Sequence, residues 1–322
     1  MSPLATLKGP LSLAPTAPAA IRPRARVINP VLLLVSCLWG VGNLLTKWVL
    51  DVLEPAALLA LRMGTVGILF VALLLIVPPR RMALRDWLMV AVFGGGLVAV
   101  QLLSFSYAMK MTTASEGSLL ISTAPAWTAA MVALLGMERV TKLNWLGIAV
   151  ASGGVVMIVL GPAGRIQANA PARLSGDLIM LASAWLYGGY MVLSRRWMQR
   201  LGDLPVICCT FAASGLLLAA FGARQLAATD WSKLTAGHWA AIAQITFLAA
   251  FVGIILWYRT IARTSASGTA VYQYLVPVVS VVGATAFLGE RIGALQLVGI
   301  AVTLMGVYLA RVPAVAGARA PA

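Results

Sequence analysis

The stretch that decides the fold is Ala266–Arg291, ASGTAVYQYLVPVVSVVGATAFLGER. Its counterpart lies 152 positions earlier, at Ala114–Arg139, ASEGSLLISTAPAWTAAMVALLGMER. Both begin with Ala-Ser, carry a proline at the same depth (Pro125 and Pro277) and end in Glu-Arg. Of the 46 aligned positions that cover this stretch and the segment after it, 12 are identical. Because apolar composition alone does not place a proline and a Glu-Arg pair in register, the chain contains an internal repeat.

A second pair of similar sequences lies at the start of the two halves. Leu38–Lys47, LWGVGNLLTK, aligns with Leu186–Arg195, LYGGYMVLSR, at an offset of 148 positions. The chain therefore divides into a first repeat, 30–160, and a second repeat, 176–311, joined by an inter-repeat linker at 161–175.

Composition indicates a membrane protein. Hydrophobic residues make up 61% of the chain and charged residues 10%, with a mean hydropathy of +0.93, whereas soluble domains average about 25% charged residues. Apolar runs of about 20 residues recur along the chain. Runs of this length cross the hydrocarbon core as helices, because lipid offers the backbone no hydrogen-bond partner. We predict an all-α integral membrane protein of ten transmembrane helices. The predicted segments are 30–50, 54–77, 85–108, 113–136, 142–160, 176–197, 204–222, 238–260, 265–288 and 293–310.

The number of segments per half predicts their relative orientation. Five spans is an odd number, so the second repeat enters the membrane upside down relative to the first. Inverted repeats related by an axis in the membrane plane are a recurrent plan of secondary transporters. A duplicated scaffold without a transport role is the alternative.

The distribution of positive charge predicts the topology. The formal net charge is +15, and with a cytoplasmic N-terminus 16 of the 24 Lys and Arg residues fall on the cytoplasmic side. This is the positive-inside pattern and not a nucleic-acid footprint. We expect a multi-pass protein of the cell's inner membrane with both termini in the cytoplasm. Residues 1–29 and 312–322 are expected to be disordered cytoplasmic tails.

Two repeats with these features resemble a known family. The Leu38–Lys47 opening, the Gly136-Met137-Glu138-Arg139 and Gly289-Glu290-Arg291 sequences, and the Gly-Ile-Ala-Val that follows each are similar to the EamA family of the drug/metabolite transporter superfamily. The resemblance covers about 30–311. It implies an exporter or permease for small organic solutes, with a central cavity lined by helices one, three, four, six, eight and nine. It also implies that the fifth and tenth helices pack at the rear, where they support a possible homodimer. Tyr187 departs from the pattern, because the first repeat has Trp39 at this position.

Charged residues inside the predicted spans are candidates for solute binding or coupling, because an ionisable group in the membrane is costly unless it is paired or faces water. Arg62 and Glu116 lie within spans, and Lys47 lies near the end of the first. In one interpretation Arg62 or Lys47 binds a solute carboxylate, and Glu116 accepts a proton or pairs with a solute amine. In the other interpretation, Glu116 forms an ion pair with Lys47 or Arg62 and has only a structural role.

The residues before Pro277 form a second group of candidates. A proline cannot donate to the helix, which frees a carbonyl one turn earlier, near Gln273. Tyr272, Gln273 and Tyr274 therefore lie where the helix is expected to be irregular, and transporters bind ligands at such breaks. Consecutive residues point in different directions, so only one or two of the three can face a cavity. Pro125 and Pro277 are the predicted hinges, although a simple packing kink is the alternative.

Mid-span polar and aromatic residues complete the candidate site. Trp39 and Asn43 share a helix face at i, i+4, and Tyr187 and Tyr190 share one at i, i+3. Gln101 is a further candidate for solute binding. The Glu-Arg pairs, in contrast, are expected to have a structural or gating role: Glu138, Arg139, Glu290 and Arg291.

The sequence favours a secondary exporter of amino acid-like, amphipathic or aromatic solutes that works by alternating access, with proton coupling as one option. A facilitative permease for drugs, nucleosides or sugar-like metabolites is the alternative, and a non-transporting scaffold is a further one. An intramembrane enzyme would need a cluster of His, Asp or Cys near the interface, and the chain has one histidine. Cys37, Cys208 and Cys209 lack metal-ligand spacing, so neither a metal nor a cofactor is expected.

Overall fold

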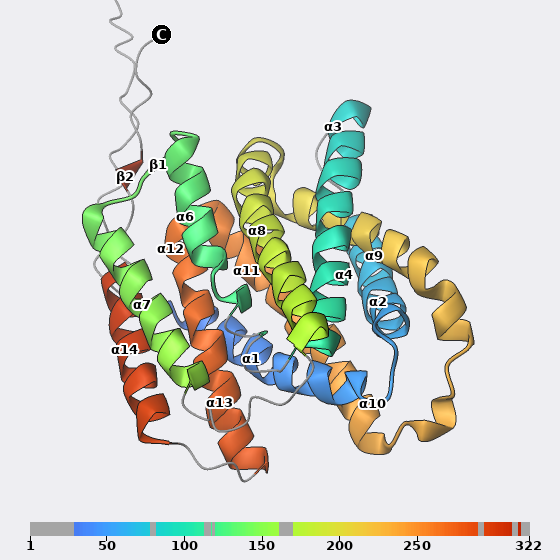
Figure 1. The fold of residues 1–322 in the computed structure, drawn as a ribbon. Coiled ribbons are helices and arrows are strands. Elements are labelled where there is room, and N and C mark those ends of the chain that lie inside the picture. Colours follow the sequence, from blue (N-terminus) through green and yellow to red (C-terminus); the bar gives the residue numbers. More distant parts are fainter. Residues whose placement is uncertain are drawn as a thin grey trace, which may run out of the picture.

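Figure 1 shows the computed structural model, which describes residues 29–77, 82–112, 117, 120–160, 170–288, 293–310 and 315–316. Helices account for almost all of these residues. Within this part of the chain, six helices are long and apolar enough to cross a membrane, and three shorter apolar helices accompany them. The predicted fold class, an all-α membrane protein, is confirmed at this level. The predicted tails lie outside the described residues, except for Asn29 and the pair 315–316.

Five helical segments are described in the first half. They are α1 (Pro30–Leu50); α2 (Pro55–Ile76); a continuous run of α3 (Leu84–Met89), the π-helix η1 (Val90–Gly95) and α4 (Gly96–Met111); α6 (Ala124–Leu134); and α7 (Lys142–Leu160). The strand β1 (Glu138–Arg139) lies between the last two and pairs antiparallel with β2 (Val315–Ala316). Of the predicted segment 113–136, only residue 117 and residues 120 onwards are described.

The second half repeats this order. It contains α8 (Ala170–Leu201); α9 (Asp203–Ala227); the 3₁₀ turn η2 (Trp231–Lys233); a run of α10 (Ala236–Ala243), the π-helix η3 (Gln244–Val252) and α11 (Gly253–Arg263); a run of α12 (Ala266–Ala270), the 3₁₀ turn η4 (Val271–Tyr274) and α13 (Leu275–Leu288); and α14 (Ala294–Ala310). Because α8 begins at Ala170, helix extends into the stretch expected to be linker.

Prolines and polar caps explain where several helices begin. Pro30, Pro55 and Pro125 lie in the first turn of α1, α2 and α6, where the missing N–H costs no intrahelical hydrogen bond. Asn29 caps α1, because its side-chain oxygen accepts from the Val31 amide at 3.0 Å. Pro125 therefore starts a helix after the turn at 122–123 and does not kink a continuous one.

Pairs of helices from the two halves pack along one another. The helix α2 packs on α9, α4 on α8, α1 on α13 and α7 on α14, and Figure 1 shows α7 and α14 side by side at one flank. Small residues permit the close approach: a Cβ on Gly215 of α9 would lie 2.3 Å from the Met63 carbonyl oxygen of α2. A Cβ on Gly306 of α14 would lie 2.2 Å from the Ala151 nitrogen of α7. Such contacts are typical of helix packing in membranes.

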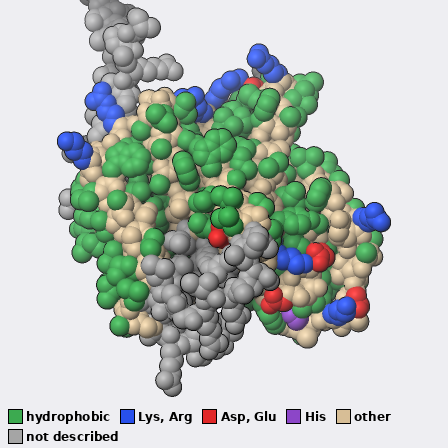
Figure 2. Space-filling view, viewed as in Figure 1, with side chains coloured by type: hydrophobic (Ala, Val, Ile, Leu, Met, Phe, Trp, Pro, Cys, Tyr) green, Lys and Arg blue, Asp and Glu red, His purple; other side chains and the backbone are tan. Residues whose placement is uncertain are grey.

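The surface matches a lipid environment. Large apolar side chains such as Leu75 and Leu216 are 79% and 72% exposed. Figure 2 shows hydrophobic side chains over most of the described face, with Lys and Arg at its upper edge and a mixed acidic and basic group at the lower right. Lipid is the solvent in which such a face is stable, so the chain is a multi-pass membrane protein.

The charged groups define two ends of the helix bundle. The Lys47 end carries Lys47, the Lys110–Glu54 ion pair at 2.7 Å, and Trp48 stacked on His238 with ring centroids 4.3 Å apart. The Glu138 end carries Glu138 together with two further ion pairs, Arg200–Asp86 at 2.7 Å and Arg259–Asp203 at 3.0 Å.

Candidate functional site

A cavity of about 1050 Å³, including its open mouth, lies between the two halves. Six aromatic residues provide much of its wall: Trp39, Phe105, Tyr187, Tyr190, Phe211 and Tyr258. Its polar lining consists of Asn43, Thr46, Gln101, Ser122 and Gln273. Among the described residues, Arg62 is the only charged one that lines it.

The cavity reaches toward the Lys47 end. On α1 its lining runs from Trp39 to Thr46, the residue before Lys47. Toward the Glu138 end it stops at an aromatic floor, where the ring centroids of Tyr190 and Tyr258 are 5.3 Å apart and those of Phe211 and Tyr258 5.6 Å.

Repeat-equivalent positions line the cavity from both halves. Trp39 and Tyr187 correspond at the offset of 148, as do Gly42 and Tyr190, and all four lie in the wall. At the offset of 152, Ile121 corresponds to Gln273, and both of these also line it. Equivalent positions of the two repeats therefore contribute to the same cavity wall.

Arg62 presents a cation to the cavity from α2. Its Nε donates to the carbonyl oxygen of Ile245 in η3 at 3.1 Å. No carboxylate of the described residues lies within ion-pair distance of this guanidinium. A guanidinium has five N–H donors, so this single bond leaves donors for a ligand. Glu116, the proposed coupling residue, lies outside the described residues.

Lys47 follows the lining residue Thr46, and its side chain is bound by backbone carbonyls. Its Nζ donates to the carbonyl oxygens of Met109 at 3.1 Å and Thr112 at 3.3 Å. The Thr112 hydroxyl in turn donates to Asp177 at 2.8 Å. Lys47 and Arg62 therefore have separate partners, and Lys47 ties the end of α1 to the end of α4.

Two of the predicted polar residues are anchored by the protein. The Gln101 side chain donates to the Ser183 hydroxyl at 3.0 Å, and the Trp39 indole donates to the Ala249 carbonyl at 2.9 Å. Trp39 also packs against Trp257, with ring centroids 4.7 Å apart. These contacts fix the orientation of the cavity wall.

Three lining side chains retain capacity for hydrogen bonds. Among the described residues, the Gln273 side-chain oxygen and the hydroxyls of Tyr187 and Tyr190 are buried without a hydrogen bond of good geometry. Buried polar groups are normally paired, and an unpaired acceptor such as the Gln273 oxygen matches a donor carried by a ligand.

Of the three candidates Tyr272, Gln273 and Tyr274, only Gln273 lines the cavity. The Tyr272 hydroxyl accepts from the Asn29 amide at 3.0 Å, and the Tyr274 hydroxyl is 2.8 Å from the Ser152 hydroxyl of α7. Both tyrosines are thus directed away from the cavity and connect neighbouring helices. The expected irregularity is present, because residues 271–274 form the 3₁₀ turn η4.

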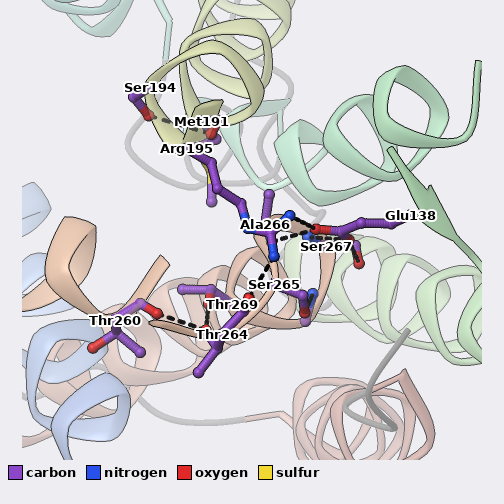
Figure 3. Close-up of polar contacts among 11 residues, drawn as sticks. Glu138, Met191, Ser194, Arg195, Thr260, Thr264, Ser265, Ala266, Ser267 and Thr269 are labelled. Carbon is purple, nitrogen blue, oxygen red and sulfur yellow. Dashed lines mark hydrogen bonds and ion pairs between the residues drawn. The ribbon is translucent and has the colours of Figure 1, made fainter. Parts of the chain in front are cut away.

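Past the aromatic floor, the Glu138 end contains a polar cluster around the buried Glu138 carboxylate (Figure 3). We call Glu138, Arg195, Thr264, Ala266 and Ser267 the Glu138 cluster. The Glu138 carboxylate accepts from the Ala266 amide at 2.9 Å, the Ser267 amide at 3.3 Å and the Ser267 hydroxyl. It also forms an ion pair with Arg195 at 2.9 Å.

Arg195 connects the rest of the cluster to Thr264, the residue that follows α11. Its Nη2 donates to the Thr264 carbonyl oxygen at 2.7 Å. Only 3% of the Glu138 side chain is exposed, so the carboxylate depends on these partners. Removing one member of a buried ion pair costs about 3–5 kcal/mol. The neighbouring Arg139 is exposed, and Glu290 and Arg291 lie outside the described residues.

Several cavity residues were missed by sequence reasoning: Phe211 and Tyr258, together with Thr46, Ser122 and Ile254. The signal for Tyr258 was weak, because Trp257 beside it offers a similar side chain; both are buried, but only Tyr258 lines the cavity. Within the described residues, no group of three His, Cys, Asp or Glu could hold a metal ion.

Comparison with known proteins agrees with this architecture. A solved crystal structure superposes with a TM-score of 0.70 at 20% identity, covering 87% of this chain and 94% of the other, and so shares the fold. The "uncharacterized transporter YdeK" of Bacillus subtilis is 28% identical over 260 residues, 80% of this chain and 88% of its own. The "probable terminal-alkyne amino-acid exporter" of Streptantibioticus cattleyicolor is 30% identical over 240 residues, 71% of this chain and 75% of its own.

The family match repeats the division into halves. The EamA-like transporter family matches residues 28–160 and again residues 174–312, which together cover most of the chain. This confirms the resemblance drawn from the Ala-Ser, proline and Glu-Arg pattern. The chain belongs to the EamA-like transporter family.

Proposed function

We propose that this protein is a secondary transporter that exports small amphipathic organic solutes, amino acid-like or aromatic, across the inner membrane. The observation that carries the proposal is the composition of the cavity: one guanidinium, that of Arg62, among the described lining residues, set in an aromatic wall. Buried charges are stable when paired, so a solute carboxylate is a fitting partner for Arg62. The aromatic residues would bury the solute's apolar part.

The named relative supports the same solute class. A carboxylate and a side chain of moderate size are features that amino acids share, and one relative is named as a probable amino-acid exporter. Gln273, whose side-chain oxygen lacks a partner, would accept a hydrogen bond from the solute's amino group. The proposed ligand is thus a zwitterion with an apolar side chain.

We propose alternating access between two inverted five-helix repeats as the mechanism. The cavity reaches toward the Lys47 end, and the Glu138 cluster lies past its floor. The positive-inside rule would place the more basic Glu138 end in the cytoplasm, so this conformation would face outward. Proton coupling through Glu116 is part of the proposal, and a facilitative permease is the alternative. A homodimer formed through α7 and α14 stays a prediction.

The test is flux through purified protein in liposomes, against a panel of amino acids, nucleosides and cationic drugs. We expect saturable flux of amino acid-like solutes that responds to a pH gradient and loses this response in Glu116→Gln. Flux that changes with neither the pH gradient nor the Glu116→Gln substitution would support a facilitative permease. Absence of flux for every solute, from folded protein, would support a non-transporting scaffold.

A further inference from the structure

We infer that the Glu138 cluster is a latch between the two halves, and that Lys47 is the basic residue of a corresponding latch at the opposite end. The inference rests on the proposed function, because a latch of this kind decides from which side the cavity can be reached. It assigns roles that the cavity itself does not explain, since none of these residues lines the cavity.

The latch joins elements of different halves. Glu138 follows α6 in the first half, whereas Arg195 lies in the last two turns of α8 and Ser265–Ser267 begin α12 in the second (Figure 3). A single carboxylate holds all of them, with two backbone amides, one hydroxyl and one guanidinium as its partners. Opening this end would separate the partners, because they lie on different helices.

The latch lies directly behind the cavity floor. On α8, Arg195 follows the floor residue Tyr190 by five positions, which is about 8 Å along a helix. At the end of α11, Thr264 follows the floor residue Tyr258 by six positions. A path from the Glu138 end to the cavity would therefore pass through the cluster first.

The repeat relates this latch to Lys47. Arg195 corresponds to Lys47 at the offset of 148, and Thr264 corresponds to Thr112 at the offset of 152. The contacts correspond as well: Arg195 donates to the Thr264 carbonyl at 2.7 Å, and Lys47 donates to the Thr112 carbonyl at 3.3 Å. Equivalent basic residues thus bind equivalent carbonyls at the two ends.

The two ends differ in the carboxylate. Arg195 is paired with buried Glu138, whereas no carboxylate of the described residues lies within ion-pair distance of Lys47. An ammonium group has three donors, and the hydrogen bonds of Lys47 to the Met109 and Thr112 carbonyls use two of them. The third is available to an acceptor that arrives when this end closes. Loss of Lys47 would then weaken the state opposite to the one observed.

The experiment measures access to the cavity from each side. A single thiol, Phe105→Cys, is placed in the cavity wall after Cys37, Cys208 and Cys209 are replaced by alanine. Its rate of reaction with a membrane-impermeant maleimide is measured in right-side-out and in inverted membrane vesicles. The matched control is Arg139→Gln, which removes an exposed charge next to Glu138.

We expect the parent thiol to react mainly from the Lys47 side. Glu138→Gln and Arg195→Gln should each raise the rate from the Glu138 side roughly tenfold or more, while Arg139→Gln leaves it unchanged. Ser267→Ala, which removes one hydrogen bond, should give a smaller rise and serves where the charge variants fail to fold. Adding Lys47→Gln to Glu138→Gln should return the rate toward the parent value.

Two results would overturn the inference. If the variants of the Glu138 cluster fold and leave the rate from the Glu138 side unchanged, the cluster is not a latch. If Lys47→Gln raises or does not alter the rate in the Glu138→Gln background, Lys47 is not its counterpart. The reaction needs no solute, so it can support the latch in a protein that transports none of the tested compounds, and can contradict it in one that does.

Discussion

Among the cavity residues, Arg62 places the strongest restriction on which solutes could bind. Its guanidinium lines the cavity, and a single hydrogen bond to the Ile245 carbonyl holds it. That bond orients the group while leaving donors toward the cavity. A bidentate guanidinium–carboxylate pair needs this planar fork, which lysine lacks.

We therefore predict that Arg62→Gln weakens binding of carboxylate-bearing solutes by roughly ten- to a hundredfold, because a charge-assisted hydrogen bond contributes about 1.5–3 kcal/mol. The amides of the same solutes should bind wild type and variant alike. Isothermal titration calorimetry of the detergent-solubilised protein measures both. Arg224→Gln, at an exposed position of α9, is the control and should change neither affinity. Equal losses of affinity for the acid and the amide would show that Arg62 acts through packing and not through its charge.

At the scale of the elements, the broken helices deserve a functional test. The 3₁₀ turn η4 precedes Pro277, and the corresponding stretch of the first half has a turn at residues 122–123, before Pro125. Residues at both breaks, Gln273 and Ser122, line the cavity. The breaks therefore place backbone and side-chain polar groups where a solute would bind.

Replacing Pro277 with alanine should make this helix more regular. The new N–H can donate to the Gln273 carbonyl, which a proline at this position leaves without its helical donor. We expect flux to slow several-fold with little loss of thermal stability, because a hinge matters to motion more than to the resting fold. The control is Pro55→Ala in the first turn of α2, where no helical bond is missing. Unchanged flux in Pro277→Ala would reduce the break to a packing kink.

The contact between α2 and α9 provides a second test at this scale. A methyl group on Gly215 would lie 2.3 Å from the Met63 carbonyl oxygen, so the helices would have to move apart. We expect Gly215→Ala to destabilise the protein by about 1–3 kcal/mol or more, measured as a lower midpoint of thermal unfolding in detergent. Gly153→Ala on α7, with nothing within 4 Å of the added Cβ, should leave the midpoint unchanged or raise it.

At the scale of the whole molecule, the distribution of charge predicts its orientation. Exposed Arg139 marks the Glu138 end and exposed Asp230 marks the loop at the Lys47 end. In the background without native cysteines, Arg139→Cys should react with an impermeant thiol reagent only in inverted vesicles. Asp230→Cys should react only in right-side-out vesicles. The reverse pattern would place the termini outside and make the observed conformation inward-facing.

The sequence identified the family and part of the cavity wall in advance. Seven of the nine proposed solute-binding residues line the cavity, and they come from five helical segments. Helix periodicity was sufficient for pairs such as Trp39 and Asn43, because neighbours at i, i+4 share a face. It could not separate Gln273 from Tyr272 and Tyr274, because which face of a buried helix meets the cavity depends on its neighbours.

By itself, the sequence determined the membrane class, the division into halves and the family, since hydropathy, spacing and repeated motifs are properties of the chain alone. Tertiary structure decided which polar groups meet. The Glu138 carboxylate lies 128 positions from the amide that it binds and 57 from Arg195, and local pattern does not encode such distances. Whether a buried charge is stable depends on the partners that the fold brings to it. For this reason the sequence predicted only a general structural or gating role for Glu138, whereas the structure shows which groups on other helices it binds.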